Sequence, residues 1–378
     1  MRSLFRLLGV AVFASAAFSV TSVASAAPIN TMVSFGDSLS DPGNALFLTK
    51  DINGPNTGAA FLASQGYAVD PAGHFSNGPT AVEYLASSLG LVTNRGWASP
   101  APFATGAATN YAVGGALTGP FLGASAPFFG FGPQHLDGFL NPIPRPELAL
   151  TGITSQVARF LGSAPAFDPA TTLFTIQGGG NDIFSARAFA AATAIPAIDQ
   201  PQFFFDVVNA STTHLANSIA QLAGAGAQKI LWMTLPDIGL TPDSQAGGLA
   251  AMGQGAGLTD LFNALLAAKV AGVDNFFSGL DLIEVDTAGF MRAAFANPAV
   301  RPTMIAPPCV STPAALPGCV DRFFFDTVHP TTAAHEMFGQ VLFRAVPEPH
   351  SLALVALALI GLAVGQRRRR QPLALLTA

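Results

Sequence analysis

The sequence predicts an α/β domain built around a parallel β-sheet. Short runs rich in β-branched and aromatic residues recur along the chain, and longer stretches with apolar residues at helical intervals separate them. This alternation is typical of parallel strands joined by crossover helices. No internal repeat is visible, and 378 residues, half of them apolar, suffice for one large domain or two small ones.

Five strands are expected, at 31–35, around 111–113, and at 172–177, 229–235 and 280–285. The helices expected beside them span 80–89, 154–161, 203–223, 258–277 and 332–343. In 203–223 the apolar residues recur at helical spacing, so one side of this helix would face the sheet.

The N-terminal segment 1–26 has the form of a secretory signal peptide. It begins with Arg2 and Arg6, continues with an apolar run and ends on Ala24-Ser25-Ala26, small residues of the kind that signal peptidase reads. The alternative is a membrane anchor, but the run is shorter than the roughly 20 residues that a span needs. We therefore expect export, with the mature domain at 27–345.

The charge pattern argues against a polyanionic partner. The two ends of the chain hold six of the 17 basic residues and one of the 22 acidic residues, so the body carries a net charge of about −10. An acidic body disfavours nucleic acid and anionic lipid headgroups. His and Cys residues show no metal-ligand spacing, and the nucleotide fingerprints are lacking, so neither a metal nor a cofactor is expected.

Two cysteines, Cys309 and Cys319, lie close together in a proline-rich stretch. In an exported protein such a pair is expected to form a disulfide, although two reduced thiols remain the alternative. A bridge here would stabilise the fold by about 2–3 kcal/mol in the chain-entropy model.

Two long stretches, 45–78 and 116–147, fit neither a helix nor a strand and are expected to be loops. Loops of this length are usually functional. The second is rich in phenylalanine, and its rings would either line an acyl or aromatic pocket or bury one another. These rings are Phe121, Phe128, Phe129, Phe131 and Phe139.

A candidate nucleophile follows the first strand. In Phe35-Gly36-Asp37-Ser38-Leu39, Ser38 stands at the carboxyl end of that strand, the edge where parallel sheets bind ligands. A single serine is more often a turn residue or a helix cap, so partners elsewhere in the chain must support this assignment. Asp37 is expected to brace the turn, and Asp41 and Asn44 to cap the helix that follows.

The segment Asp326-Thr327-Val328-His329 supplies the expected partners. A serine hydroxyl needs a base within hydrogen-bond reach, and that base needs a carboxylate to orient it. Asp326 and His329 stand on one turn and can serve together. The other five histidines have no comparable setting in the sequence and are left as structural residues: His74, His135, His214, His335 and His350.

Two glycine-rich segments complete the pattern. Gly178-Gly179-Gly180-Asn181-Asp182 follows a strand, and the Asn181 amide can donate two hydrogens to an oxyanion, while Asp182 would fix the loop. The segment from Asn110 to Ala116 ends in Gly114 and Gly115, where a backbone N–H can approach a ligand because no Cβ intervenes.

These four segments, in this order, resemble the four blocks of the SGNH/GDSL hydrolases, the GDSL-type esterase/lipase family. Three further stretches, at 75–78, 154–157 and 235–239, also resemble family segments, so the likeness spans roughly 31–343. It implies a three-layer α/β/α sandwich, flavodoxin-like, with a five-stranded parallel sheet. It also implies a serine hydrolase that cleaves carboxylic esters through an acyl-serine intermediate.

Carried over by position, the resemblance makes Ser38 the nucleophile, His329 the general base and Asp326 its orienting carboxylate. The oxyanion hole would consist of the Ser38 N–H, the Gly115 N–H and the Asn181 side chain. One departure is Gln177, which stands where the family usually has an apolar residue and would alter the packing behind Asn181.

The segment 346–370 resembles a PEP-CTERM sorting signal. It contains Pro347-Glu348-Pro349, an apolar run at 352–365 and four arginines at 367–370, and 371–378 follows as an unusual extra tail. The resemblance implies a sorting protease as partner, transient membrane contact through 352–365, and a location outside the cell or in the envelope of a Gram-negative bacterium. A permanent C-terminal anchor is the alternative.

The substrate remains open at this point. A small-molecule or lipid ester fits the phenylalanine-rich stretch, and an acetylated carbohydrate fits the acidic, exported character of the chain. A non-catalytic surface or matrix protein that keeps the fold is a third possibility, against which the intact set of serine, glycine, asparagine and histidine argues.

Overall fold

The computed structural model describes residues 27–50, 68–97, 103–120, 150–163, 166–193, 195–311 and 319–347, all within one unit, Ala27–Pro347. The expected signal peptide at 1–26, the five phenylalanines of the second long loop, His135, His350 and the sorting segment beyond residue 347 lie outside the described residues.

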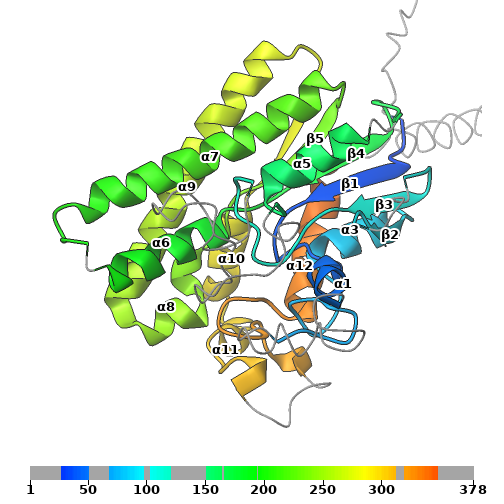
Figure 1. Ribbon diagram of the computed structural model, residues 1–378. Helices are drawn as coiled ribbons and strands as arrows, with labels where there is room; N and C mark the ends of the chain where they lie inside the picture. The colour runs from blue at the N-terminus through cyan, green and yellow to red at the C-terminus, as the bar shows by residue number, and fades with distance from the viewer. Residues whose placement is uncertain are drawn as a thin grey trace, which may run out of the picture. The chain divides into compact units, whose positions relative to one another are not determined.

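A parallel sheet of six strands, in the order β2-β3-β1-β4-β5-β6, forms the centre of the described structure (Figure 1). Every neighbouring pair runs parallel. The strands are β1 (Thr31–Phe35), β2 (Val92–Arg95), β3 (Ala107–Asn110), β4 (Thr172–Ile176), β5 (Lys229–Met233) and β6 (Asp281–Val285).

The expectation of five strands was wrong by one edge strand, β2. Its residues Val-Thr-Asn-Arg form no apolar run and are partly or fully exposed, so no hydrophobic pattern marks the strand. When β2 is set aside, the other five strands follow the order 2-1-3-4-5, which is the flavodoxin-like order. The α/β/α sandwich is thus confirmed, with one strand added at its edge.

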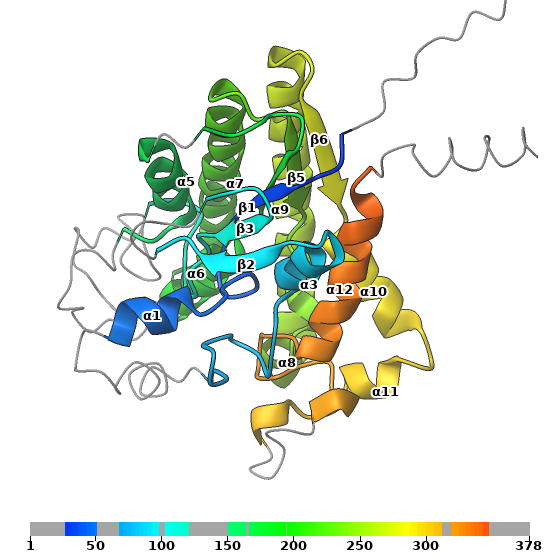
Figure 2. The ribbon, with the colours of Figure 1, turned by 90° about the vertical axis from the view of Figure 1, so that its right-hand side faces the viewer.

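Helices cover both faces of the sheet, which gives three layers (Figure 2). The alternation of side chains along each strand explains why both faces are apolar. In β1, Val33 and Phe35 pack with α5, α6, α7 and α9 on one face, whereas Met32 packs with α3, α10 and α12 on the other. The helices of the first face are α5 (Ile153–Gly162), α6 (Gly180–Ala192), α7 (Gln200–Gly224) and α9 (Gly248–Phe276). Those of the second face are α3 (Ala81–Ser88), α10 (Thr287–Ala296) and α12 (Thr332–Ala345).

Three short helices lie near the ends of these elements: α1 (Asn44–Lys50), α8 (Pro242–Ala246) and α11 (Arg301–Met304). Among the described residues, α9 is the helix that is long and apolar enough to cross a membrane. Its buried side chains, Leu258, Phe262, Leu266 and Val270, belong to the core that it shares with α7 and the sheet.

The order of the strands creates a site at their carboxyl ends. From β1 the chain passes to β2 and β3 on one side of β1 and then returns to β4 on the other side. Ligands bind where the strand order reverses in this way, because the loops diverge there and leave a crevice. The segments that follow β1, β3 and β4 carry Ser38, Gly115 and Asn181, so adjacent strands bring all three residues to one crevice.

A cluster of aromatic rings packs against β1 on the face of the sheet that α5 covers. Phe160 of α5 is fully buried, and its ring centre lies 5.6 to 6.0 Å from those of Phe35, Tyr111, Phe103 and Phe174. Edge-to-face contacts of this kind stabilise the fold beyond the effect of burying the rings. The strand that leads to Ser38 is therefore held by close packing on its α5 side.

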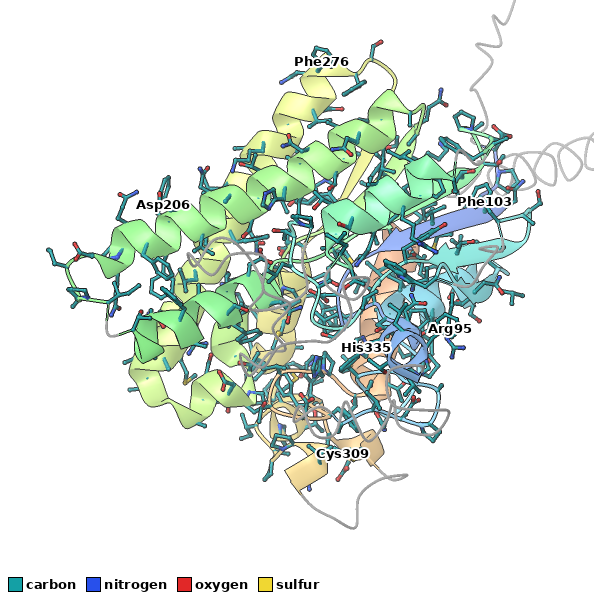
Figure 3. The ribbon with its side chains drawn as sticks, viewed as in Figure 1. Arg95, Phe103, Asp206, Phe276, Cys309 and His335 are labelled. Atoms are coloured by element: carbon teal, nitrogen blue, oxygen red, sulfur yellow. A yellow bond between two sulfur atoms is a disulfide. The ribbon has the colours of Figure 1, made fainter. Side chains whose placement is uncertain are left out.

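Replacing Phe160 with alanine should lower the free energy of unfolding by about 3–5 kcal/mol, because it leaves a cavity among packed rings. Phe276→Ala is the matched control, since Phe276 is 81% exposed at the end of α9 (Figure 3). The control should change the stability by less than about 0.5 kcal/mol. Chemical denaturation measures both, and equal losses would contradict the described packing.

Candidate active site

The turn after β1 presents Ser38. Gln156 of α5 binds both backbone groups of Gly36: its Oε1 accepts the Gly36 N–H at 2.9 Å, and its Nε2 donates to the Gly36 carbonyl at 2.8 Å. Asp37 then closes the turn by accepting the Leu39 N–H at 3.0 Å. These bonds hold the serine in one orientation at the end of the strand.

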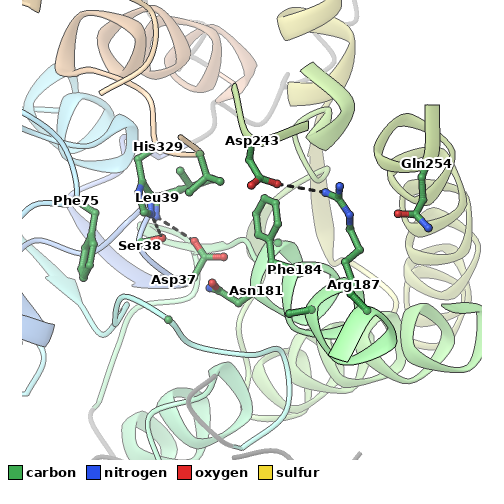
Figure 4. Close-up of a pocket in the computed structure, with 15 residues that line it drawn as sticks. Asp37, Ser38, Leu39, Phe75, Asn181, Phe184, Arg187, Asp243, Gln254 and His329 are labelled. Atoms are coloured by element: carbon green, nitrogen blue, oxygen red, sulfur yellow. Dashed lines mark hydrogen bonds and ion pairs between the residues drawn. The ribbon is translucent and has the colours of Figure 1, made fainter. Parts of the chain in front are cut away.

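Ser38, His329 and Asp326 form a connected chain of hydrogen bonds (Figure 4 shows the first two). Ser38 Oγ lies 2.8 Å from His329 Nε2, and His329 Nδ1 lies 2.6 Å from Asp326 Oδ2. All three side chains are largely buried, so water competes little for these bonds. The expected grouping of the three residues is what the structure contains.

The loop that carries His329 is folded by Asp326 itself. Asp326 Oδ1 accepts the N–H groups of Val328 at 2.9 Å and of His329 at 2.7 Å, so the carboxylate orients both the backbone and the imidazole. Cys309 and Cys319 are joined by a disulfide just before this loop (Figure 3 labels Cys309). Cys309, Cys319 and Phe325 form one buried cluster, which connects the disulfide to the His329 loop.

The buried carboxylates set the protonation of the imidazole. Burial alone would lower the pKa of His329, but the charge of Asp326 and its hydrogen bond, together with the charge of Asp37, raise this pKa above its ordinary 6.5. Burial opposes ionisation of Asp326, but His329 and the backbone N–H groups hold the pKa of this carboxyl below its ordinary value. Burial raises the pKa of Asp37 to about 6.

Asn181 and Gly115 line the same cavity as Ser38. Asn181 stands in the first turn of α6, and its Nδ2 donates one hydrogen to the Ala116 carbonyl at 3.0 Å. The second hydrogen of this amide can serve a ligand. Gly114 donates its N–H to Asp41 Oδ2 at 2.8 Å, so that group is occupied, whereas Gly115 lines the cavity.

Asp41 connects the loop after β1 to the loop after β3. One of its oxygens accepts the N–H groups of Gly43 and Asn44, and the other accepts those of Ala45 and Gly114. This confirms Asp41 as a cap for α1 and adds the bond to Gly114, which the sequence did not suggest. Burial raises its pKa to about 6 despite these bonds.

His74, which the sequence left as a structural residue, has two carboxylate partners that the sequence analysis did not identify. Its Nδ1 lies 2.8 Å from Asp70 Oδ2 and its Nε2 lies 3.2 Å from Glu83 Oε2. Burial lowers the pKa of His74, but the two carboxylates raise it to about 10, so the imidazole stays protonated and cannot act as a base near neutral pH. The spacing of four residues from Asp70 was the available signal.

The residues after His74 pack against the His329 loop. The Phe75 ring centre lies 5.5 Å from that of His329, and Ser76 Oγ donates to the Pro330 carbonyl at 2.9 Å. Asn77 Oδ1 accepts the Thr332 N–H at 2.9 Å. The supporting role of this segment was not predicted, although its likeness to a family segment pointed to it.

Gln177 does not reach the reacting groups. Its Oε1 accepts a hydrogen bond from Ser40 Oγ at 3.3 Å, so this end of the side chain contacts the serine turn. Within the described part of the chain, no group of three or more His, Cys, Asp or Glu side chains is arranged to hold a metal ion.

The cavity has a volume of about 570 Å³, within the range of small-molecule sites. Ser38, His329 and Asn181 line one end. The wall then continues along α6 and is completed by side chains of α8 and α9; the described residues on this side are Phe184, Arg187, Ala188, Ala191, Asp243 and Gln254.

Two family models match the sequence of this chain. The family model described as GDSL-like Lipase/Acylhydrolase matches residues 32–342, and that of the PEP-CTERM protein-sorting motif matches residues 345–370.

Three relatives illustrate the similarity. The thermolabile hemolysin of Vibrio parahaemolyticus is 25% identical over 84% of this chain and 64% of its own length. A GDSL esterase/lipase of Arabidopsis thaliana is 26% identical over 83% of this chain and 90% of its own. Esterase EstA of Pseudomonas aeruginosa is 25% identical over 90% of this chain, which spans only 50% of that protein.

Among solved structures, an acetyl xylan esterase aligns with 84% of this chain and all of its own, at 12% identity and a TM-score of 0.36.

Asp41→Ala should reduce the free energy of unfolding by about 2–4 kcal/mol, because it leaves several buried N–H groups without an acceptor. Asp274→Ala, at an exposed position of α9, is the matched control and should have little effect. Urea denaturation of both variants measures the difference. Equal stabilities would show that Asp41 does not hold the two loops.

Proposed function

The chain belongs to the GDSL-like lipase/acylhydrolase family, and from this premise we propose that it hydrolyses carboxylic esters through an acyl intermediate on Ser38. The observation that carries the proposal is the pair of hydrogen bonds that joins Ser38 Oγ to His329 Nε2 at 2.8 Å and His329 Nδ1 to Asp326 at 2.6 Å. A hydroxyl, a base and an orienting carboxylate in this order are the arrangement that activates a serine.

In the first half of the reaction, Ser38 Oγ attacks the ester carbonyl carbon while His329 Nε2 takes the hydroxyl proton. The carbonyl oxygen becomes an oxyanion, which accepts hydrogen bonds from the N–H groups of Ser38 and Gly115 and from the Asn181 amide. His329 then gives its proton to the leaving alcohol oxygen, the carbon–oxygen bond breaks, and the acyl group stays on Ser38.

In the second half, water attacks the acyl-Ser38 carbonyl carbon and His329 accepts a proton from it. The tetrahedral intermediate collapses, the bond to Ser38 Oγ breaks, and His329 returns its proton to that oxygen. Asp326 remains ionised throughout, because His329 and the backbone N–H groups keep its pKa low. Its charge stabilises the imidazolium that forms in each half of the cycle.

The sorting-motif match at residues 345–370 indicates a location in the envelope of a Gram-negative bacterium and processing near the C-terminus. We propose that residues 1–26 act as the signal peptide, that a sorting protease cuts at Pro347-Glu348-Pro349, and that 352–365 contacts the membrane only transiently. Mass spectrometry of the protein recovered from such cells would show both cleavages, and an intact C-terminus would favour a permanent anchor.

Ser38→Ala should lower the hydrolysis of p-nitrophenyl acetate by at least about a thousandfold, because no other group replaces the nucleophile. Ser87→Ala, at an exposed position of α3, is the matched control and should keep full activity. A fluorophosphonate probe should label Ser38, as read by peptide mass. Retained hydrolysis in Ser38→Ala, or no adduct on the native protein, would favour a non-catalytic surface protein.

The value of kcat/KM should fall as the pH drops through a pKa above 6.5, because only neutral His329 accepts the serine proton and nearby carboxylates raise its pKa. Asp326→Asn removes the largest raising charge, so the acid limb should move to lower pH while the rate falls. Asp206→Asn, far away on α7, should leave the limb in place. An unmoved limb in Asp326→Asn would contradict the role of His329.

A further inference from the structure

One side of helix α6 lines the cavity along much of its length. The side chains of Asn181, Phe184, Arg187, Ala188 and Ala191 line the cavity at intervals of three or four residues, which places them on one side of the helix. Because an α-helix rises 1.5 Å per residue, Arg187 stands about 9 Å along the axis from Asn181. The cavity therefore extends from the reacting groups to a defined far end.

That far end is polar. Arg187 Nη1 lies 3.6 Å from Asp243 Oδ2 and donates to Ser244 Oγ at 3.2 Å, so α6 is tied to α8 there. Figure 4 shows the Arg187 side chain rising between Asp243 and Gln254, with the Phe184 ring on the side of Ser38. The Arg187 side chain is 16% exposed and that of Asp243 is 50% exposed, so both can meet a ligand without a large rearrangement.

The donor and acceptor set defines the chemistry of a ligand at this end. The contacts of Arg187 with Asp243 and Ser244 both use Nη1, and Nη2 and Nε can donate to a ligand oxygen. Asp243 can accept a hydrogen bond, and the Gln254 amide can do either. Hydroxyl groups are the ligand groups that satisfy all three, because each hydroxyl both donates and accepts.

The charges of Arg187 and Asp243 disfavour two other kinds of ligand at the far end of the cavity. A long alkyl chain would cover the guanidinium and the carboxylate and remove their water without replacing its hydrogen bonds, which costs free energy. An anionic headgroup would find the positive charge of Arg187 already balanced by Asp243, 3.6 Å away, in a protein with a net negative charge.

We propose that the far end of the cavity binds the hydroxyl groups of a neutral polyol or carbohydrate whose ester lies at Ser38, with Arg187, Asp243 and Gln254 as the specificity-determining residues. The Phe184 ring packs against the apolar side of the sugar ring between the two ends. This inference rests on the proposed ester hydrolysis and specifies its alcohol.

Two substrates of matched shape test the proposal: methyl 6-O-acetyl-glucoside and cyclohexylmethyl acetate. They share the acetyl group and a six-membered ring, and they differ in the ring hydroxyls. The protein should have the higher kcat/KM for the glucoside acetate. Arg187→Met should lower that value about tenfold or more, chiefly through KM, and change the value for cyclohexylmethyl acetate less than about twofold.

Arg301→Met, at an exposed position of α11, is the matched control and should behave as the native protein. Gln254→Leu supplies a second variant at an exposed position that does not endanger folding, and it should also raise KM for the glucoside acetate alone. A preference of the native protein for cyclohexylmethyl acetate, or equal losses on both substrates in Arg187→Met and Gln254→Leu, would overturn the inference.

The two proposals can fail separately. If Ser38→Ala keeps its hydrolysis of p-nitrophenyl acetate, the ester-hydrolase mechanism fails. If that hydrolysis depends on Ser38 but the native protein does not prefer the glucoside acetate, only the assignment of the alcohol fails.

Discussion

The arrangement of the whole site depends on one hydrogen bond, between Ser38 Oγ and His329 Nε2, whose residues are 291 positions apart. Its short distance requires that the end of β1 and the loop before α12 be fixed independently. Gln156 and the aromatic cluster around Phe160 hold the serine side, while the 75–77 segment and the disulfide hold the histidine side. Because these supports lie on different elements, the hydrogen bond between Ser38 and His329 forms only when the sandwich is complete.

Two buried carboxylates connect the loops at the edge of the sheet. Asp41 joins the loop after β1 to Gly114 after β3, and Asp182 joins the start of α6 to Thr118 and to Ser211 of α7. Burial raises the pKa of both groups, which is the electrostatic cost of placing them there. The hydrogen bonds of these carboxylates hold in place the loop with the Gly115 N–H and the helix start with the Asn181 amide, the two groups proposed to donate to an oxyanion.

The strongly apolar elements could be predicted from the sequence, and the weakly patterned ones could not. β1 was predicted over its full length and β4 to within one residue, because both are short, buried apolar runs. β3 was placed a few residues too late, since its Ala-Ala-Thr-Asn sequence has small side chains and no hydrophobic signal. The triad of Ser38, Asp326 and His329 could be assembled from motifs, because each residue stands in a short local pattern. His74 was left as a structural residue, but its ion pair with Glu83 was missed, because Glu83 comes from α3 and is near His74 only in the fold.

The error with the widest consequence concerned α6. The glycines before Asn181 suggested a loop, and Gly179 does adopt a left-handed backbone, but the helix begins directly after it at Gly180. As part of a loop, Asn181 would be an isolated donor. As part of the first helical turn, Asn181 shares one face with Phe184 and Arg187, so one helix carries both the proposed oxyanion donor and the far end of the cavity. A helix cannot change this separation without unwinding. In the proposed mechanism, the same helix therefore fixes the distance between the oxyanion donor and the groups that would bind the alcohol part of the substrate.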